Sequence, residues 1–335
     1  MRAALLIAGW CLLIAGGAAQ HVPKTEGASE HEAKKAVMWR EPVDLTSRDL
    51  KYGIGGEKDA PKGKMTFVKE DLKQNSPKFD VKDEDGRKWR VKLGVEAKSE
   101  TAATRLLWAV GYLTDEDYFV PNLQVDGLPP LKRGRKFEQG DHVHAARLEL
   151  RDKDEKKEGP WHWRKNPFTG TREFNGLRVM MCVLNNWDLK DENNSIYRDK
   201  ETGEERYVVS DVGATFGRAG RSWTSDMSKD DPKAYSEAKF IVKKTEKTVT
   251  FNISQHLPWI YVFNIVKPQR YWQFKRRQWI GRNIPRQDAK WIGGLLGQLS
   301  DAQLRDAFVS SGYNDEQTDE LMGTLKKRIR ELNEI

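Results

Sequence analysis

The sequence predicts an α+β fold, in which a β-rich part at residues 61–150 precedes a larger, mainly helical part at residues 151–335. Short stretches of alternating apolar and polar residues gather between residues 65 and 93, which is typical of strands. Apolar residues recur with a helical period at residues 173–184 and again at residues 300–332. Hydrophobic residues make up 38 % of the chain and charged residues 32 %, a composition that folds rather than one that stays disordered.

Residues 1–19 have the pattern of a secretory signal sequence. Arg2 precedes an apolar run at residues 3–14, and small residues ending at Ala19 follow it. The apolar run is shorter than a typical membrane span. We therefore expect cleavage after Ala19, a periplasmic or secreted location, and no stable transmembrane span in the mature protein. An uncleaved N-terminal anchor is the alternative.

The cysteines limit how the fold is stabilised. Cys11 would leave with the signal, so Cys182 would be the one remaining thiol and no disulfide within the mature chain is expected. The fold must then depend on its hydrophobic core. Cys182 follows Met180 and Met181 in an apolar run, which predicts a buried and unreactive thiol.

The charge of the chain indicates which partners it favours. The formal net charge is +8, and the basic residues are spread along the chain. A net positive charge favours anionic ligands such as phosphates. No single basic block dominates, and an exported protein rarely meets DNA, so no nucleic acid is expected as a partner.

Residues 20–60 are rich in Lys, Glu, Gly and Ala and show little periodicity, which predicts a flexible leader. The glycines of residues 52–56 could hold a phosphate, but no clear strand precedes them and no clear helix follows. An ordinary turn is the favoured interpretation of that segment.

The β-rich part begins with three expected strands, at residues 65–68, 78–81 and 89–93. The second and third are joined by a hairpin turn at residues 83–86, which ends in Gly86. The first and second strands are linked by residues 74–78, a turn of small residues that ends in Lys78.

Lys92 and Glu100 are expected to form a buried pair. Strand alternation places Lys92 on the opposite face from Val91 and Leu93. A helix is expected from Ser99–Glu100 onward, and Glu100 shares its apolar face. A buried carboxylate needs a partner, and Lys92 is the natural one. Glu96 is the alternative to Glu100 as the carboxylate that pairs with Lys92. A helix N-terminal acid that complements the helix dipole is the other interpretation of Glu100.

The chain then alternates between strands and irregular segments before it reaches a helix. Further strands are expected at residues 118–125 and 143–150. The charge run at residues 151–159 has no core residues, which predicts a hinge or an insertion. The aromatic segment at residues 160–167 is expected to pack inside the protein, and residues 173–184 to form a helix.

A polar loop follows this helix, with the sequence N-N-W-D-L-K-D-E-N-N at residues 185–194. An expected hairpin, with strands at residues 195–198 and 206–210, brings a D-V-G motif at residues 211–213 close to that loop.

The side chains of these two segments suit phosphoryl transfer. Asp188 can accept the proton of an attacking hydroxyl, and Lys190 can neutralise charge on the transferred group. Asn193 and Asp211 can bind Mg²⁺ against the phosphates of a nucleotide.

These motifs, D-L-K-D-E-N and D-V-G, resemble H-R-D-L-x-x-x-N and D-F-G of the protein-kinase superfamily. The resemblance covers about residues 65–215, and its glycine-poor phosphate loop is most similar to those of the atypical HipA-like and spore-coat-like kinases. It implies an exported, bacterial-type member with two lobes: a small β-rich lobe at residues 61–150 and a larger helical lobe at residues 151–335.

The resemblance also implies a site for ATP and Mg²⁺. Residues 74–78 would cover the phosphates, with Ser76 and Lys78 facing phosphate oxygens. An ordinary hairpin with a solvated Lys78 is the alternative. Lys92 would anchor the phosphates of ATP, and Glu100 would hold Lys92 in place.

The resemblance further implies that no phosphorylation switch operates here. Trp187 stands where regulated protein kinases have an arginine that pairs with a phosphorylated activation segment. No A-P-E motif follows residues 217–231, which occupy the place of that segment.

The C-terminal part offers a basic, aromatic stretch and a pair of helices. Residues 259–286 would form either a docking face for an anion or the exterior of the large lobe. Ser300 and Asn314 are expected to cap the last two helices, which would close the large lobe.

Three functions agree with the sequence. The first is a kinase-like enzyme that transfers phosphate from Mg-ATP to an unknown protein, lipid or small-molecule acceptor. The second is a non-catalytic module that binds a nucleotide. The third is a surface-associated structural or glycan-binding protein that uses the Trp-rich segments.

Overall fold

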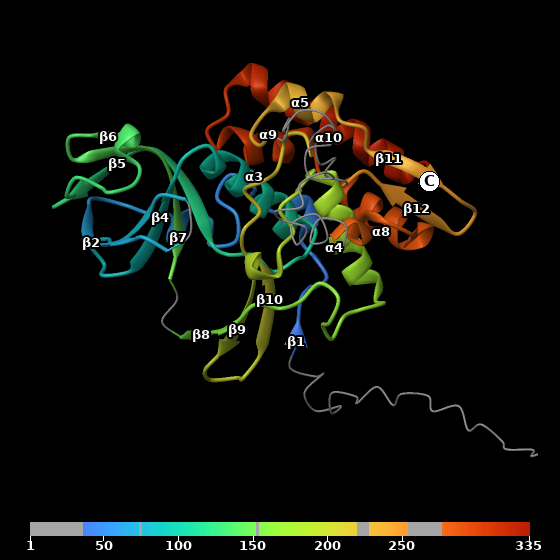
Figure 1. Ribbon diagram of the computed structural model, residues 1–335, viewed down its shortest axis with the longest axis horizontal. Helices are drawn as coiled ribbons and strands as arrows, with labels where there is room; N and C mark the ends of the chain where they lie inside the picture. Colours follow the sequence, from blue (N-terminus) through green and yellow to red (C-terminus); the bar gives the residue numbers. More distant parts are fainter. Residues whose placement is uncertain (1–35, 74–75, 152–153, 220–227, 254–276) are drawn as a thin grey trace, which may run out of the picture.

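The computed structural model describes residues 36–73, 76–151, 154–219, 228–253 and 277–335. It has a mixed α/β architecture: a six-stranded sheet lies at one end of the molecule, and most of the helices lie at the other (Figure 1). The expected signal sequence, residues 1–19, lies outside the described residues. Within the described part of the chain, no helix is long and apolar enough to cross a membrane.

The six-stranded sheet closes on itself. Its order is β4-β3-β2-β5-β7-β6, and β4 also pairs with β7, so five of the strands form a ring. The ring encloses an apolar cluster that includes Phe79, Trp89 and Val91. The strands expected near residues 65–93, 118–125 and 143–150 are therefore confirmed. The strands are β2 (Met65–Asp71), β3 (Lys78–Lys82), β4 (Lys88–Leu93), β5 (Asp117–Asp126), β6 (Glu138–Gln139) and β7 (His142–Leu150).

A second sheet has the order β1-β10-β9-β8. The expected hairpin is present as β9 (Asn194–Asp199) and β10 (Glu205–Val209), and β1 (Ala36–Val37) pairs in parallel with β10. The charge run at residues 151–159 was expected to be a hinge or an insertion, but its second half forms β8 (Glu155–Gly159). The backbone ladder of an edge strand needs no apolar side chains, so the composition gave no strand signal.

The remaining regular elements lie mainly in the helical part. Both expected caps are confirmed, because Ser300 and Asn314 each form a capping box with the glutamine three residues later. The helices are α2 (Gly56–Asp59), α3 (Glu96–Ala109), α4 (Arg172–Val183), α5 (Pro232–Glu237), α8 (Arg286–Leu296), α9 (Asp301–Val309) and α10 (Asp315–Asn333); the short 3-10 turns are η1 (Leu45–Ser47), η2 (Arg135–Phe137), η3 (Asp191–Asn193) and η4 (Gln278–Gly281); and the strands are β11 (Ile241–Lys244), β12 (Thr248–Phe251) and β13 (Ile284–Pro285).

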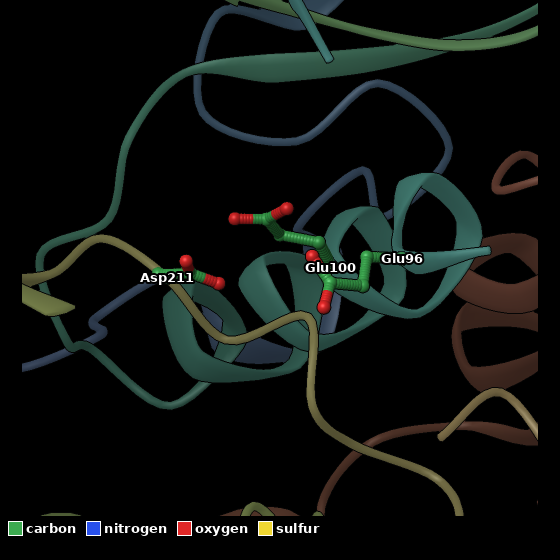
Figure 2. A group of neighbouring side chains, drawn as sticks. All are labelled: Glu96, Glu100 and Asp211. Atoms are coloured by element: carbon green, nitrogen blue, oxygen red, sulfur yellow. The ribbon is translucent and has the colours of Figure 1, made fainter. Parts of the chain in front are cut away.

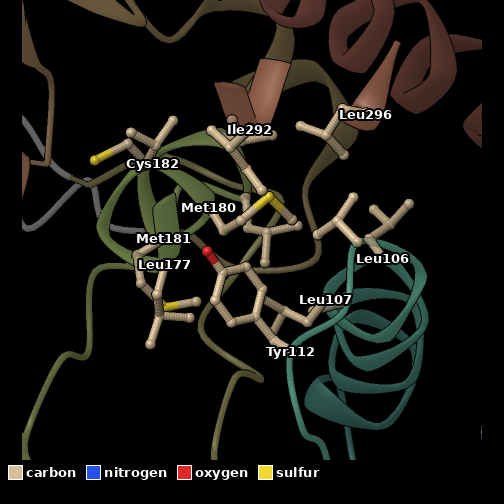
Figure 3. Close-up of a cluster of buried hydrophobic side chains, with 14 of the residues drawn as sticks. Leu106, Leu107, Tyr112, Leu177, Met180, Met181, Cys182, Ile292 and Leu296 are labelled. Carbon is tan, nitrogen blue, oxygen red and sulfur yellow. The ribbon is translucent and has the colours of Figure 1, made fainter. Parts of the chain in front are cut away.

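A larger apolar core joins α3 to the helices behind it. Leu107 of α3, Met180 of α4 and Ile292 of α8 meet there, and Tyr112 lies among them (Figure 3). The Tyr112 hydroxyl donates a hydrogen bond to the Glu173 carbonyl at 2.7 Å. Because α3 packs on this core, its first turn is held at a fixed place next to the loop that follows β10.

Helix α3 begins earlier than the sequence predicts. Ser99 was expected to open the helix, but the helix starts at Glu96. The Ser99 hydroxyl instead donates to the Gly213 carbonyl at 2.8 Å, so this serine joins the helix to the D-V-G turn. A serine that bonds a distant carbonyl cannot be told from a helix-capping serine by its neighbours in the sequence. The start of the helix was therefore predicted too late.

The flexible-leader interpretation is wrong for residues 36–60. Met38, Leu45 and Leu50 of this segment are buried in the larger core. Their irregular spacing matches neither a helical nor a strand period, so the segment gave no periodic signal. It packs because single apolar side chains enter the core from a largely irregular backbone.

We predict that Leu50→Ala lowers the free energy of unfolding by about 2–5 kcal/mol, because it leaves a cavity at a side chain that is 0 % exposed. Val43→Ala, in the same segment, removes methyl groups from a residue that is 93 % exposed and should change stability by less than about 0.5 kcal/mol. Urea denaturation of the two variants checks this. Equal, small effects would show that the segment is not packed.

Candidate functional site

The site centres on the ammonium group of Lys92. Its Nζ lies 2.8 Å from Glu96 Oε2, 2.8 Å from Glu100 Oε2 and 3.3 Å from Asp211 Oδ1. The expected contact between Lys92 and Glu100 is thus present. Glu96, the second candidate for that contact, lies equally near, so one lysine draws together carboxylates from α3 and from the end of the second sheet.

Neighbouring backbone contacts hold Asp211 in this position. The N–H groups of Ser210 and Asp211 both donate to the Asn193 carbonyl, at 3.0 and 3.1 Å. Gly213 approaches α3 so closely that an added Cβ would lie 2.8 Å from Glu96 Cβ. A glycine is therefore required for space at this turn, and the D-V-G turn and the first turn of α3 are fixed against each other.

Arg147, a buried arginine on β7, lies next to Glu100, the partner of Lys92. Arg147 Nε donates to Asp117 Oδ2 at 2.7 Å, Arg147 Nη1 donates to Glu149 Oε2 at 3.1 Å, and Nη1 lies 3.7 Å from Glu100 Oε1. Sequence reasoning missed Arg147 as part of the site. The available signal was the spacing of Arg147 and Glu149, which puts two charged residues on one face of β7.

Burial and charge set the protonation of this cluster. Burial alone would lower the pKa of Lys92, but the carboxylates of Glu100, Asp211 and Glu96 together raise it above its ordinary value. Burial would raise the pKa of Glu96, yet Lys92 and Lys229 lower it to about 2. Lys92 is therefore held as a cation.

The carboxylates around Lys92 form a candidate metal site. Glu96, Glu100 and Asp211 offer ligand oxygens that all lie within 4.8 Å of one another, and they point toward a common space (Figure 2). Oxygen ligands of this kind suit Mg²⁺ and Mn²⁺. The two glutamates were not expected as ligands; the sequence indicated Asn193 and Asp211 for that role.

Asn193 lies beside Asp211 but is already engaged. Its Nδ2 donates to the Asp188 carbonyl at 2.6 Å, and its own backbone carbonyl accepts from residues 210 and 211. Asn193 therefore links the loop of Asp188 to Asp211, and its side-chain oxygen remains the group that suits a metal.

Asp188 and Lys190 contact each other in the loop that Asn193 joins to Asp211. Lys190 Nζ lies 2.7 Å from Asp188 Oδ2, and the Asp188 N–H donates to Asn186 Oδ1 at 3.0 Å. Neither residue is among those that line the Lys92 cleft, whereas Asn193 and Asp211 are.

The link before β3 also reaches the cleft. Residues 74 and 75 lie outside the described residues. Ser76 Oγ lies 3.4 Å from Glu96 Oε2, and Lys78 Nζ lies 3.9 Å from Asp71 Oδ2. Burial lowers the pKa of Lys78, and its side chain is 11 % exposed. The solvated hairpin lysine that the sequence left as an alternative is therefore not what the structure shows.

One cleft collects the expected nucleotide-binding and metal-binding residues. It lies between β3, β4, β7 and the edge of the second sheet. The described residues that line it are Ser76, Lys78, Arg90, Lys92, Glu100, Arg147, Glu149, Arg151, Lys157, Glu192, Asn193, Ser195, Tyr197, Ser210 and Asp211.

The segment after the D-V-G turn folds back on itself and contacts Glu96 of α3. The Asp230 N–H donates to the Thr215 carbonyl at 3.0 Å, and Lys229 forms an ion pair with Glu96. Burial raises the pKa of Asp230 to about 6, against the opposing effects of the Tyr313 hydroxyl and of Lys98. Residues 220–227 of this segment lie outside the described residues.

The chain matches no protein-family model, and no curated protein is similar to it in sequence. Among solved structures, it is similar to the Helicobacter pylori proinflammatory kinase CtkA, with a TM-score of 0.44 and 10 % identity over 82 % of this chain and 97 % of that chain. It is also similar to the Golgi casein kinase, with a TM-score of 0.36 and 10 % identity, covering 87 % of this chain and 74 % of that chain. For the Golgi casein kinase with Mn/ADP bound, the TM-score is 0.35 and the identity 9 %, with the same coverage.

Asp230 predicts a pH dependence of stability. A pKa that is higher in the folded protein means that folding favours the protonated carboxyl. This stabilisation is complete below about pH 4 and is lost as the pH rises through the folded pKa of about 6.

We therefore expect Asp230→Asn, which tolerates the backbone φ of 53° at this position, to gain stability relative to the unmodified protein as the pH rises. The gain between pH 4.5 and pH 8 should be about 1–3 kcal/mol. Chemical denaturation at the two pH values measures it, and a difference that does not change with pH would contradict the assignment.

Proposed function

We propose that the protein is an exported, atypical kinase-like protein, which binds a metal–nucleotide complex in the Lys92 cleft and transfers a phosphoryl group to an acceptor hydroxyl. One observation supports the proposal: two carboxylates from distant segments meet the ammonium group of Lys92 on β4. Glu100 of α3 lies 2.8 Å from Lys92 Nζ, and Asp211 at the end of the second sheet lies 3.3 Å from it. In a phosphoryl-transfer site this arrangement anchors the phosphates and holds the metal ligand beside them.

The donor atoms fit a divalent metal and a phosphate chain. Glu96, Glu100 and Asp211 supply closely spaced oxygens, and Asn193 adds an amide oxygen at the same edge. A bound Mg²⁺ or Mn²⁺ would neutralise the charge that develops on the phosphate oxygens. Lys92 and Lys78 would hold phosphate oxygens from the β-strand side of the cleft.

The transfer step needs a base next to the cleft. The acceptor oxygen would form a bond to the terminal phosphorus, the bond from that phosphorus to its bridging oxygen would break, and the nucleoside diphosphate would leave. Asp188 would take the proton of the acceptor hydroxyl. Lys190, which contacts Asp188 Oδ2, would turn toward the transferred group and offset its charge.

The two-lobed arrangement remains part of the proposal. Two separate apolar clusters support it, one inside the strand ring and one among the helices. The cleft lies where the strands of the ring face the second sheet. Residues 61–150 would form the small lobe, and residues 151–335 would form the large lobe.

We predict that Asp188→Asn lowers phosphate transfer by about 10²- to 10⁴-fold and leaves the affinity for Mg-ADP within about threefold, because a base acts on the acceptor and not on the nucleotide. Release of labelled phosphate from Mg-ATP to protein, lipid, small-molecule and water acceptors measures transfer. Calorimetry measures affinity.

Asp126→Asn is the matched control, because Asp126 is an exposed carboxylate at the far end of β5 and should change neither quantity. Nucleotide binding without transfer to any acceptor would favour a non-catalytic binding module. Glycan binding that ignores both Asp188→Asn and Lys92→Ala, with no nucleotide binding, would favour the glycan-binding alternative and end the kinase proposal.

A further inference from the structure

The cleft around Lys92 has an unusual lining for a nucleotide site. Among the described residues that line it, none is aliphatic, and Tyr197 supplies the one aromatic ring. Ligand sites for bases and cofactors are mostly lined by apolar and aromatic side chains, with few polar groups. The described residues that line this cleft have the opposite composition.

Its charged side chains are mostly cations. Six basic residues line the cleft, against four acidic residues. The basic residues are Lys78, Arg90, Lys92, Arg147, Arg151 and Lys157, and the acidic ones are Glu100, Glu149, Glu192 and Asp211. With more basic than acidic side chains and no aliphatic one among the described residues, such a lining favours an anionic ligand.

The lining also contains polar atoms that need partners. Arg147 Nη2 and Ser195 Oγ are buried and have no hydrogen-bond partner among the described residues. Arg147 is 2 % exposed and Ser195 is 1 % exposed, so each is a costly group to leave unsatisfied. A ligand rich in acceptor oxygens would satisfy both donors, whereas the face of a base would not.

Two backbone N–H donors at the end of β7, beside the lining residue Arg151, are already engaged. The Leu150 N–H donates to the Glu116 carbonyl at 2.9 Å, and the Arg151 N–H donates to the Lys88 carbonyl at 2.8 Å. Both donors at the end of β7 are therefore used within the sheet.

The one aromatic ring is partly covered. Lys157 Nζ lies over the ring of Tyr197, 5.6 Å from its centroid. A base that stacked on this face would have to displace an ammonium group. Within the described part of the chain no ion pair joins Lys157 to a carboxylate, so its charge is available to a ligand anion.

We propose that this cleft holds its ligand through the phosphate chain and discriminates little between bases, so that inorganic tripolyphosphate and nucleoside triphosphates of any base bind with similar affinity. This inference rests on the proposed function, since it concerns the donor of the same site. Stacking of a base on an aromatic ring typically raises affinity by about five- to hundredfold. A cleft that stacked the base would therefore bind a nucleoside triphosphate more tightly than tripolyphosphate by about that factor.

The test is calorimetry of the full chain with Mg²⁺ and, in turn, ATP, GTP, CTP and tripolyphosphate. We expect the four dissociation constants to lie within tenfold of one another. A spread of tenfold or more, with ATP or any other nucleotide ahead of tripolyphosphate, overturns the inference and leaves the proposed function standing. Failure of all four to bind overturns the proposed function and this inference with it.

A variant pair tests the mechanism of binding. Lys157→Ala should weaken all four ligands by the same factor, about fivefold, because its ammonium group contacts phosphate. Lys156→Ala is the control: it removes the adjacent lysine, which is 66 % exposed and pairs with Glu158, and should leave all four affinities unchanged. If Lys157→Ala weakens the nucleotides but not tripolyphosphate, Lys157 contacts the base and the inference is wrong.

Discussion

The structure depends on one ammonium group that is shared by three carboxylates. Lys92 is 8 % exposed, and a buried cation is costly unless it is paired. Glu96, Glu100 and Asp211 supply the pairing, and Arg147 keeps Glu100 from being left with a single partner. Removal of Lys92 would leave three carboxylates close together, with Glu100 buried, so the contacts between β4, α3 and the turn after β10 are mutually dependent.

That dependence explains why distant segments form one site. β4 fixes Lys92 through its pairing with both β3 and β7, and α3 is fixed by its packing on the helical core. The D-V-G turn is tied to α3 by Ser99 and lies against Glu96 because Gly213 has no side chain. Asn193 then joins this turn to the loop of Asp188. The same contacts that hold the fold therefore place Lys92 and the candidate metal-binding carboxylates at one charged cleft, with Asp188 beside it.

The sequence predicted the Lys92–Glu100 pair at the centre of this site, but it did not predict every residue that contacts the pair. Strand alternation at Lys92 and the helical period after Glu100 were sufficient to pair these two residues, because local periodicity determines which face a side chain occupies. Arg147 and Glu96 were harder to assign, since their contacts come from the closure of the strand ring and from an early helix start. The packing of residues 36–60 gave no signal, because Met38, Leu45 and Leu50 follow no period and are buried only through tertiary contacts.

In the proposed function, Lys92 and Asp211 act together on one metal–phosphate ligand. A double-mutant cycle tests it most directly, with Lys92→Met, Asp211→Asn and the double variant measured by calorimetry for Mg-ADP. Shared contact with the ligand predicts that the two single losses do not add, with a coupling energy of at least about 1 kcal/mol. Losses that add within about 0.3 kcal/mol would contradict the claim, because they would show that the two side chains contribute independently.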